Sequence, residues 1–298
     1  MQEREMKRLP SSTGRGSEDN LKKDIILTKP DRTLIMGILN CTPDSFSDGG
    51  RYMDREKAVS HALDMISSGA DIIDIGGEST RPGFTEVSEE EELKRVIPVV
   101  TELAGSSALL SVDTTKAAVA EASVQAGADI INDISGNLKG NRLTEIAAAS
   151  GAYLVIMFNA RVNGPAEGSI MERALSEISA NIDHALSCGV KEDRLIIDPG
   201  IGFGTTRGQD AELTRNVDKL SFGGRFKVLY AASRKRIVKE LFGAADSEKD
   251  LDDHSDVLAL FAASKGADII RTHRVEELGI KLRAIDRITG KGQDPWIS

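Results

Sequence analysis

Polar and ionisable side chains follow eight short apolar segments of the chain, each at the point where the segment ends. The set consists of Asn40, Glu78 with residues 79–83, Asp113, Asn132 with Asp133, Asn159, Asp198, residues 233–235, and Arg271 with His273. A single Asp or Asn in such a position often does no more than cap the next helix. Eight such positions in the same structural setting are expected to face one pocket.

Four members of this set suit the edge of a flat heterocycle. Asp113, Asn132, Asp198 and Lys235 combine carboxylate, amide and ammonium groups, which can satisfy alternating donors and acceptors. Phe203 lies on the glycine-rich stretch DPGIGFG. It is either a hydrophobic plug for its loop or an aromatic wall beside a ring-shaped substrate.

A second group suits an anion that carries several oxygens. Arg81, Arg271 and His273 are cationic or hydrogen-bonding groups, and Asn40 is followed by a loop of small polar residues. A guanidinium group forks onto two phosphate oxygens at once. The sequence therefore predicts a heterocycle site and an anion site side by side.

The segments that carry these residues predict a parallel barrel. They are continuous apolar runs, as in strands covered on both faces, at residues 34–40, 71–77, 109–114, 129–135, 153–159, 194–200, 228–235 and 268–275. Helical patterns lie between them, at residues 55–68, 88–103, 115–126, 169–188, 211–220, 255–265 and 275–288. This alternation favours a single-domain (β/α)8 TIM barrel, whose chemistry lies at the carboxyl ends of the strands. An open doubly wound sheet is the alternative, but no GxGxxG turn follows the first strand.

Composition limits the class of protein and its surroundings. A net charge of −9 over 298 residues argues against a general nucleic-acid binder. The apolar runs are far shorter than the roughly 20 residues of a membrane-spanning helix, so we expect no membrane partner. Two cysteines without a CxxC spacing indicate a reducing, cytoplasmic setting. We expect a disordered polar tail at residues 1–22, a barrel at 23–290 and a C-terminal tail at 291–298, with residues 243–253 as a solvated acidic loop.

Seven motifs together resemble one family. ILNCTPDSFSDGG, DIGGESTRPG, SVDTTK, NDISG, DPGIGFG, SRK and RTH occur in the order typical of the dihydropteroate synthases, a pterin-binding family. The resemblance implies a (β/α)8 transferase of folate biosynthesis that is the target of sulfonamides. Such enzymes join 4-aminobenzoate to 6-hydroxymethyl-7,8-dihydropterin pyrophosphate and release pyrophosphate with Mg2+. Family members are often homodimers, so a homodimer is expected here.

The resemblance also implies a role for each matching position. The residues implied to hold the pterin are Asp113, Asn132, Asp198 and Lys235 at its edge, with Met157 and Phe203 on its faces. Asn40 would contact Mg2+, and Arg271 and His273 would bind pyrophosphate. The residues implied to close over the site and shape the aminobenzoate pocket are Phe46, Thr80, Arg81 and Pro82. Lys235, Asp113, Arg271 and His273 are the implied catalytic groups.

Several positions depart from the family pattern, mostly on the amine side and at the rim. Arg236 stands where a Ser or Thr hydroxyl usually meets the aminobenzoate carboxylate, and its bulk could instead fill the pocket. The other departures are Phe158, Thr205, Ala231 and Arg274. They leave open an alternative, a pterin-binding paralogue with weak or no synthase activity or with a different arylamine substrate. A pterin-dependent methyltransferase and a Schiff-base aldolase that uses Lys235 fit the motifs less well.

Overall fold

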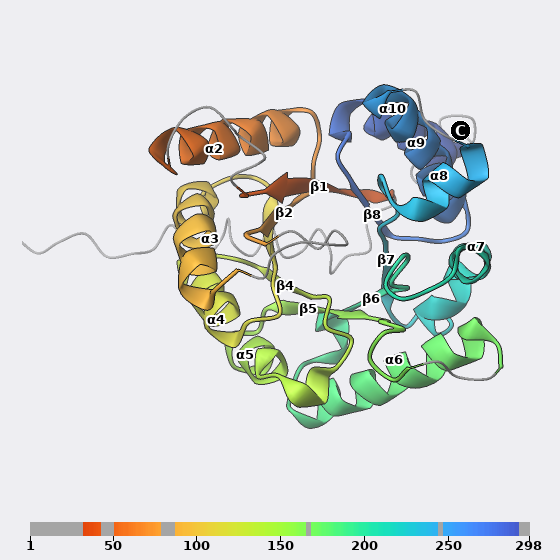
Figure 1. Cartoon of the computed structure of the whole chain (residues 1–298), viewed down its shortest axis with the longest axis horizontal. Coiled ribbons are helices and arrows are strands. Elements are labelled where there is room, and N and C mark those ends of the chain that lie inside the picture. Colours follow the sequence, from red (N-terminus) through yellow and green to blue (C-terminus); the bar gives the residue numbers. More distant parts are fainter. Residues whose placement is uncertain (1–31, 43–50, 79–86, 165–167, 244–246, 292–298) are drawn as a thin grey trace, which may run out of the picture.

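Eight parallel strands close into one barrel in the computed structural model, which describes residues 32–42, 51–78, 87–164, 168–243 and 247–291 (Figure 1). The strands are β1 (Leu34–Asn40), β2 (Ile72–Gly76), β3 (Leu109–Asp113), β4 (Ile130–Asp133), β5 (Tyr153–Met157), β6 (Leu195–Asp198), β7 (Lys227–Tyr230) and β8 (Ile269–Thr272). Each strand pairs with the next in the chain, and β1 closes the ring with β8. The predicted (β/α)8 fold is confirmed.

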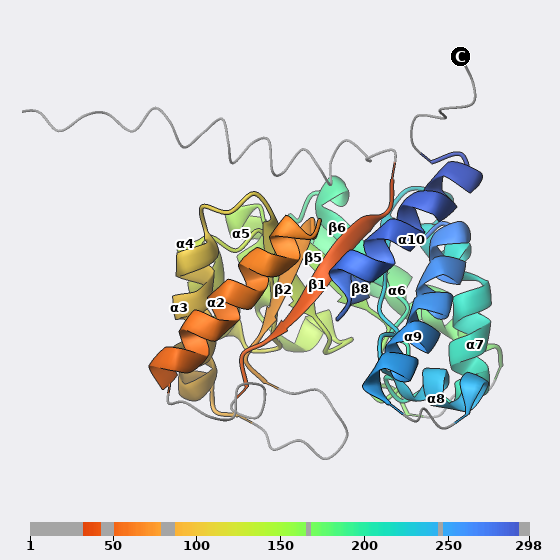
Figure 2. The ribbon, with the colours of Figure 1, turned by 90° about the horizontal axis from the view of Figure 1, so that it is seen from above.

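Helices surround the barrel and cover its outer face. They are α2 (Arg51–Ser67), α3 (Glu89–Leu103), α4 (Ala117–Ala126), α5 (Leu143–Ser150), α6 (Ile170–Ser187), α7 (Arg207–Arg215), α8 (Arg236–Phe242), α9 (Glu248–Ser264) and α10 (Val275–Ile288), with short 3-10 turns η2 (Leu138–Gly140), η3 (Glu192–Arg194) and η4 (Val217–Ser221). Figure 2 shows α8, α9 and α10 together on one side of the barrel. Gly69, Gly127 and Gly266 have φ of 102°, 116° and 104°, as expected of glycines that end helices before a strand.

The interior of the barrel is apolar at its base. Successive residues of a strand point to opposite faces, so every second residue lies inside the barrel. The interior cluster contains Leu34, Met36, Ile72, Leu109, Ile130, Tyr153, Val155, Ile196, Leu229 and Ile269, all of them buried. A larger cluster fills the space between the strands and the helices. The polar residues at the carboxyl ends of the strands therefore lie above an apolar core. They must make their hydrogen bonds with one another or with a ligand.

Three expectations about the elements were wrong. Helices α5 and α8 were not predicted, and α9 begins at Glu248. The stretch expected to be a solvated acidic loop therefore contains the first turns of α9, with Ser247 as its N-cap. The predicted tails lie outside the described residues, apart from Lys291, whose ammonium donates to the carbonyl of Ala267. Within the described ranges, no helix has the length and apolarity needed to cross a bilayer.

Candidate active site

A polar layer closes the inside of the barrel at the carboxyl ends of its strands. It continues the inward alternation of the apolar base, because Asp74 lies two residues beyond Ile72 and Arg271 two beyond Ile269. The inward polar residues are Asp74, Ser111, Asp113, Asn132, Asp198 and Arg271. Strand parity therefore brings together residues that are far apart in the sequence.

Asp74 is the centre of this layer and is fully buried. Its carboxylate accepts hydrogen bonds from Ser111 Oγ at 2.6 Å, Asn132 Nδ2 at 3.1 Å and Arg271 Nε at 2.6 Å. Asp74 was not among the predicted site residues, because it lies in the middle of DIIDIGG rather than at the end of that segment. The signal was present, since an acidic residue within an apolar strand is an informative exception.

Arg271 is held by two carboxylates. Its Nη2 also donates to Asp113 Oδ2 at 3.1 Å. The guanidinium group therefore bridges β2 and β3 from its position on β8. Its placement joins the predicted heterocycle set to the predicted anion set.

Asn132 carries an unsatisfied acceptor in the same layer. Its side chain is 2% exposed, and Oδ1 has no hydrogen-bond partner in the described structure. A buried polar atom without a partner is costly, so such atoms are often found where a ligand completes the bonding. Asn132 Nδ2 is committed to Asp74, which fixes the orientation of the amide and leaves Oδ1 for a donor on a ligand.

Asp198 and Lys235 lie on the opposite side of the layer. Asp198 Oδ1 accepts from Gly200 N–H at 2.7 Å, and Lys235 Nζ donates to the Ile201 carbonyl at 2.7 Å. Gly200 has φ of 69°, and a Cβ there would come within 1.6 Å of the Phe158 carbonyl oxygen, so only glycine fits this close turn. The DPGIGFG loop thereby holds Lys235 next to the end of β6.

Phe203 lies between two cations. Lys235 Nζ is 4.7 Å from the centre of its ring, and Arg161 Cζ is 5.4 Å from it. Both distances fall within the range of cation–π attraction. The ring is partly exposed and does not belong to the buried core.

Burial shifts the ionisation of the polar layer. Burial and repulsion by Asp74 raise the pKa of Asp113 to about 7, against the opposing effect of Arg271. Burial lowers the pKa of Lys235 to about 8, although Asp198 favours its charged form. Burial also raises the pKa of Asp198, against the effect of Lys235. Burial therefore favours the neutral forms of Asp113, Asp198 and Lys235.

The described residues predicted to bind an anion lie at the ends of β1 and β8, beside the turn that follows β7. His273 Nδ1 lies 2.9 Å from Ser233 Oγ, so the ring is oriented by a hydroxyl group that follows β7. Asn40 ends β1 and is partly buried. Asn40 Oδ1 would lie 4.0 Å from a Cβ placed on Gly76, which locates the amide above the end of β2.

The remaining residues predicted to bind substrate lie at the edge of the polar layer, on its rim or outside the described residues. Met157 is 1% exposed at the end of β5, opposite Asp198 in the strand register. Arg236 is the first residue of α8 and is exposed, so its side chain does not fill a buried pocket. Phe46, Thr80, Arg81 and Pro82 lie outside the described residues.

Three members of the strand-end ring have local structural roles. Asp133 accepts from Ser135 and Asn141 in the loop that follows it. Asn159 donates to the Ile134 and Ser135 carbonyls, and Arg234 turns toward α9. The helix-capping or loop-stabilising interpretation is therefore the better one for these three.

Comparison with known proteins identifies the family. Residues 36–273 match the family described as pterin binding enzyme. A dihydropteroate synthase of Staphylococcus haemolyticus is 39% identical over 251 residues, which cover 84% of this chain and 92% of that protein. The chain belongs to the dihydropteroate synthase family of pterin-binding enzymes.

Solved structures of this family share the architecture. A dihydropteroate synthase from Clostridium difficile, determined in the presence of pteroic acid, is 38% identical with a TM-score of 0.81 over 86% of this chain and 97% of its own. The Xanthomonas albilineans enzyme with 4-aminobenzoic acid is 39% identical with a TM-score of 0.81 over 87% and 93%. The resemblance inferred from the seven motifs is confirmed over most of the chain.

The departures from the family pattern mostly lie away from the polar layer. Phe158 is buried beneath Arg173, whose guanidinium carbon is 5.5 Å from the ring centre. Thr205 bonds Asp210, and Arg274 pairs with Asp253 of α9. Each of these residues has a partner of its own. None of them takes the place of Asp113, Asn132, Asp198 or Lys235, the four residues predicted to hold a heterocycle.

Proposed function

We propose that the chain joins 4-aminobenzoate to the methylene carbon of 6-hydroxymethyl-7,8-dihydropterin pyrophosphate, which yields 7,8-dihydropteroate and pyrophosphate. The observation that carries this proposal is the buried edge formed by Asp113, Asn132 and Asp198, with one amide oxygen left without a partner. A pterin offers ring N–H and amino donors along one edge. Membership of the dihydropteroate synthase family supports the same assignment.

The binding step follows from the polarity of the layer. Asp113, Asn132 Oδ1 and Asp198 would accept hydrogen bonds from the pterin, and Lys235 would donate to its carbonyl or ring nitrogen. The partners that fix these side chains, such as Asp74 for Asn132, form the site before the ligand enters. Little reorganisation is then needed on binding. Met157 and Phe203 would contact the two faces of the ring.

The chemical step would break the bond between the methylene carbon and the pyrophosphate oxygen, whose electron pair leaves with pyrophosphate. The aniline nitrogen of 4-aminobenzoate would then form the new C–N bond and lose a proton to water. His273 and Arg271 would stabilise the charge of the leaving group, and the carboxylate of Asp113 would stabilise the cation at the pterin. The aniline nitrogen is itself a nucleophile, so no strong general base is required.

We also propose that Mg2+ assists the departure of pyrophosphate and is held by Asn40. No cluster of three or more His, Cys, Asp or Glu side chains suited to a metal occurs among the described residues. A single amide oxygen nevertheless fits Mg2+, which is often bound through one or two protein ligands, phosphate oxygens and several waters. When bound, the ion would neutralise charge that develops on pyrophosphate.

The aminobenzoate side is proposed to use Arg236. Its exposed guanidinium group at the start of α8 can meet a carboxylate at the rim without entering the buried layer. Phe203 would pack against the aminobenzoate ring as it approaches the pterin. Sulfonamides, which resemble aminobenzoate but lack its carboxylate, would compete for the same place.

A homodimer and a cytoplasmic location are further proposals. Val257 and Phe261 on α9 are 50% and 39% exposed, and Ile280 and Ile288 on the neighbouring α10 are 60% and 81% exposed. The members of each pair are four and eight residues apart, so they lie on one side of their helix, where a second copy of the chain would pack. Cys41 and Cys188 are both unpaired, which supports a reducing compartment.

The test of the proposed function is turnover of 4-aminobenzoate and dihydropterin pyrophosphate with Mg2+, with product and pyrophosphate measured in parallel. We expect the two products to appear in equal amounts. Pyrophosphate without dihydropteroate would show that water captures the cation and would overturn the choice of amine. Failure to bind the pterin substrate would overturn the proposal as a whole.

A further inference from the structure

The turn that follows β7 has a costly backbone conformation. Lys235 N–H donates to the Ala232 carbonyl at 3.1 Å, which closes a β-turn over residues 232–235. Arg234, the third residue of this turn, has φ of 58°. Turns with positive φ at this position favour glycine or asparagine, because a longer side chain crowds the backbone there. Something outside the turn must therefore hold Arg234 in place.

Two residues of α9 hold it. Arg234 Nε and Nη2 donate to the two carboxylate oxygens of Asp252 at 2.7 and 2.8 Å, and Arg234 N–H donates to Ser255 Oγ at 3.0 Å. Asp252 and Ser255 are 7% and 5% exposed. A two-point ion pair of this kind is stronger and more directional than a pair of exposed charges. The backbone and the side chain of Arg234 are thus both fixed by one helix.

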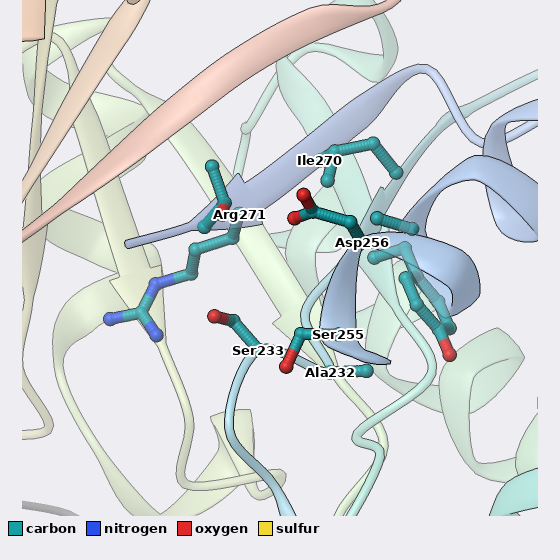
Figure 3. Close-up of a pocket in the computed structure, with 9 residues that line it drawn as sticks. Ala232, Ser233, Ser255, Asp256, Ile270 and Arg271 are labelled. Carbon is teal, nitrogen blue, oxygen red and sulfur yellow. The ribbon is translucent and has the colours of Figure 1, made fainter. Parts of the chain in front are cut away.

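The turn presents the residues on either side of Arg234 to the barrel. Ser233 reaches His273 at 2.9 Å, and Lys235 reaches the Ile201 carbonyl at 2.7 Å. Figure 3 shows Ser233 beside Ser255, with Asp256 of α9 near them. The cavity that these three residues help to line is about 10 Å³, about the room that one water molecule needs. The turn therefore has little space in which to shift against α9.

We propose that Asp252, through its ion pair with Arg234, is a positioning residue for pterin pyrophosphate. It would hold the turn in the one conformation that aims Lys235 at the pterin edge and Ser233 at the histidine beside the leaving group. This inference rests on the proposed function, because its effect is expected in the affinity for that substrate. It assigns a role to Asp252, which lies in the stretch 243–253 that was expected to be a solvated acidic loop.

The test compares Asp252→Asn with Asp253→Asn in the full chain. Asp252→Asn keeps the shape of the side chain but removes the charge that holds Arg234. We expect the KM for dihydropterin pyrophosphate to rise at least fivefold, while the KM for 4-aminobenzoate changes less than twofold. Asp253 is 46% exposed and pairs with Arg274, away from the turn. Asp253→Asn is therefore the matched control, and both KM values should stay within twofold of the wild type.

A pH profile separates positioning from a general loss of stability. The groups that act on the charge of Lys235 from the surrounding elements are Asp198, Arg271, Asp210 and Asp113. If Asp252→Asn lets Lys235 move toward water, the alkaline limb of kcat/KM should shift to higher pH. A lower melting temperature with an unchanged alkaline limb and unchanged KM values would overturn the proposal, because it would show a structural ion pair only.

Arg234→Lys keeps the test decisive if Asp252→Asn fails to fold. Lysine retains the charge but cannot make the two-point contact, so the same selective rise in KM is expected. Wild-type KM values for Arg234→Lys would overturn the proposal. If the wild type binds the pterin substrate without synthesis, the comparison is made with Kd. A wild type that binds no pterin refutes the proposed function, and this inference with it, before any variant is compared.

Discussion

Asp74→Asn tests the charge balance of the polar layer directly. Asparagine keeps the size of the side chain, and its oxygen can still accept from Arg271 and Asn132 while its NH2 group faces Ser111 Oγ. Only the negative charge is lost. Removal of one partner from a buried ion pair typically costs about 3–5 kcal/mol. Because Arg271 keeps Asp113 as a second partner at 3.1 Å, we expect the lower part of this range, about 3 kcal/mol.

The expected loss of stability is large enough to measure. A domain of this size loses about 2–4 °C of melting temperature per kcal/mol, so Tm should fall by about 6–12 °C. Ser111→Ala is the matched control, because it removes one hydrogen bond to Asp74 without a change of charge. It should cost only about 1 kcal/mol.

The same substitution should move one limb of the pH profile and leave the other in place. Asp74 is the second cause, after burial, of the raised pKa of Asp113, which lies at about 7. Loss of its charge lowers that pKa, so Asp113 stays ionised at lower pH and the acid limb of kcat/KM for dihydropterin pyrophosphate moves down. Asp74 is not among the causes that set the pKa of Lys235 at about 8, so the alkaline limb should stay where it is.

The assay is kcat/KM for the pterin substrate across a pH range that spans both values. Ser111→Ala should leave both limbs unchanged. An acid limb that stays in place or rises in Asp74→Asn would refute the reasoning, because it would mean that Asp113 does not set that limb. Movement of both limbs together would show that the substitution disturbed the whole layer rather than one interaction.

Three further substitutions test separate parts of the site. Lys235→Met should abolish turnover yet raise the free energy of unfolding at pH 7 by up to about 3 kcal/mol, and Tm with it. The folded pKa of about 8 lies below the ordinary 10.5, so the cost of the buried charge is fully present at pH 7 and fades only as pH rises between the two values. A Tm below that of the wild type would contradict this. Asn40→Ala should raise the Mg2+ concentration needed for half-maximal rate about tenfold, since one contact to a charged group is worth about 1.5–3 kcal/mol, and an unchanged Mg2+ titration would remove Asn40 from the metal site. Arg236→Ser should raise the KM for 4-aminobenzoate by up to about fivefold. The Ki of a sulfonamide should rise by less, because a sulfonamide lacks the carboxylate. An equal change in both constants would argue against a contact between Arg236 and the carboxylate.

The barrel could be predicted because its strands are covered on both faces and read as continuous apolar runs. The failure to predict α8 and the first turns of α9 has a physical explanation. Helix α8 has seven residues and directly follows the turn over residues 232–235, so too few residues remain to show a helical period. The first turns of α9 are rich in acidic residues, and their ion pairs with Arg234 and Arg274 join elements that are distant in the sequence. No local pattern shows such pairs.

The site could be predicted in its residue types but not in its connections. Asp113, Asn132 and Asp198 were found because each lies at the last or second-last position of a strand, and parity along the strand then turns them inward. Asp133 ends the same strand as Asn132 but points the other way, so the same rule selected a residue with a loop-stabilising role. Asp74 was missed because its importance comes from three partners on three other strands.

The polar layer contains more acids than bases, and this imbalance determines which kind of ligand it favours. Three inward carboxylates, those of Asp74, Asp113 and Asp198, share two cations, Arg271 and Lys235. Asp74 and Arg271 form the tight pair, so Asp113 and Asp198 retain acceptor capacity that burial makes costly. A ligand that offers several N–H donors along one flat edge relieves this cost, whereas one that offers only acceptors increases it. Under the proposed function, selectivity for a pterin would therefore arise from the acceptors that the layer leaves without donors as much as from the donors that it supplies.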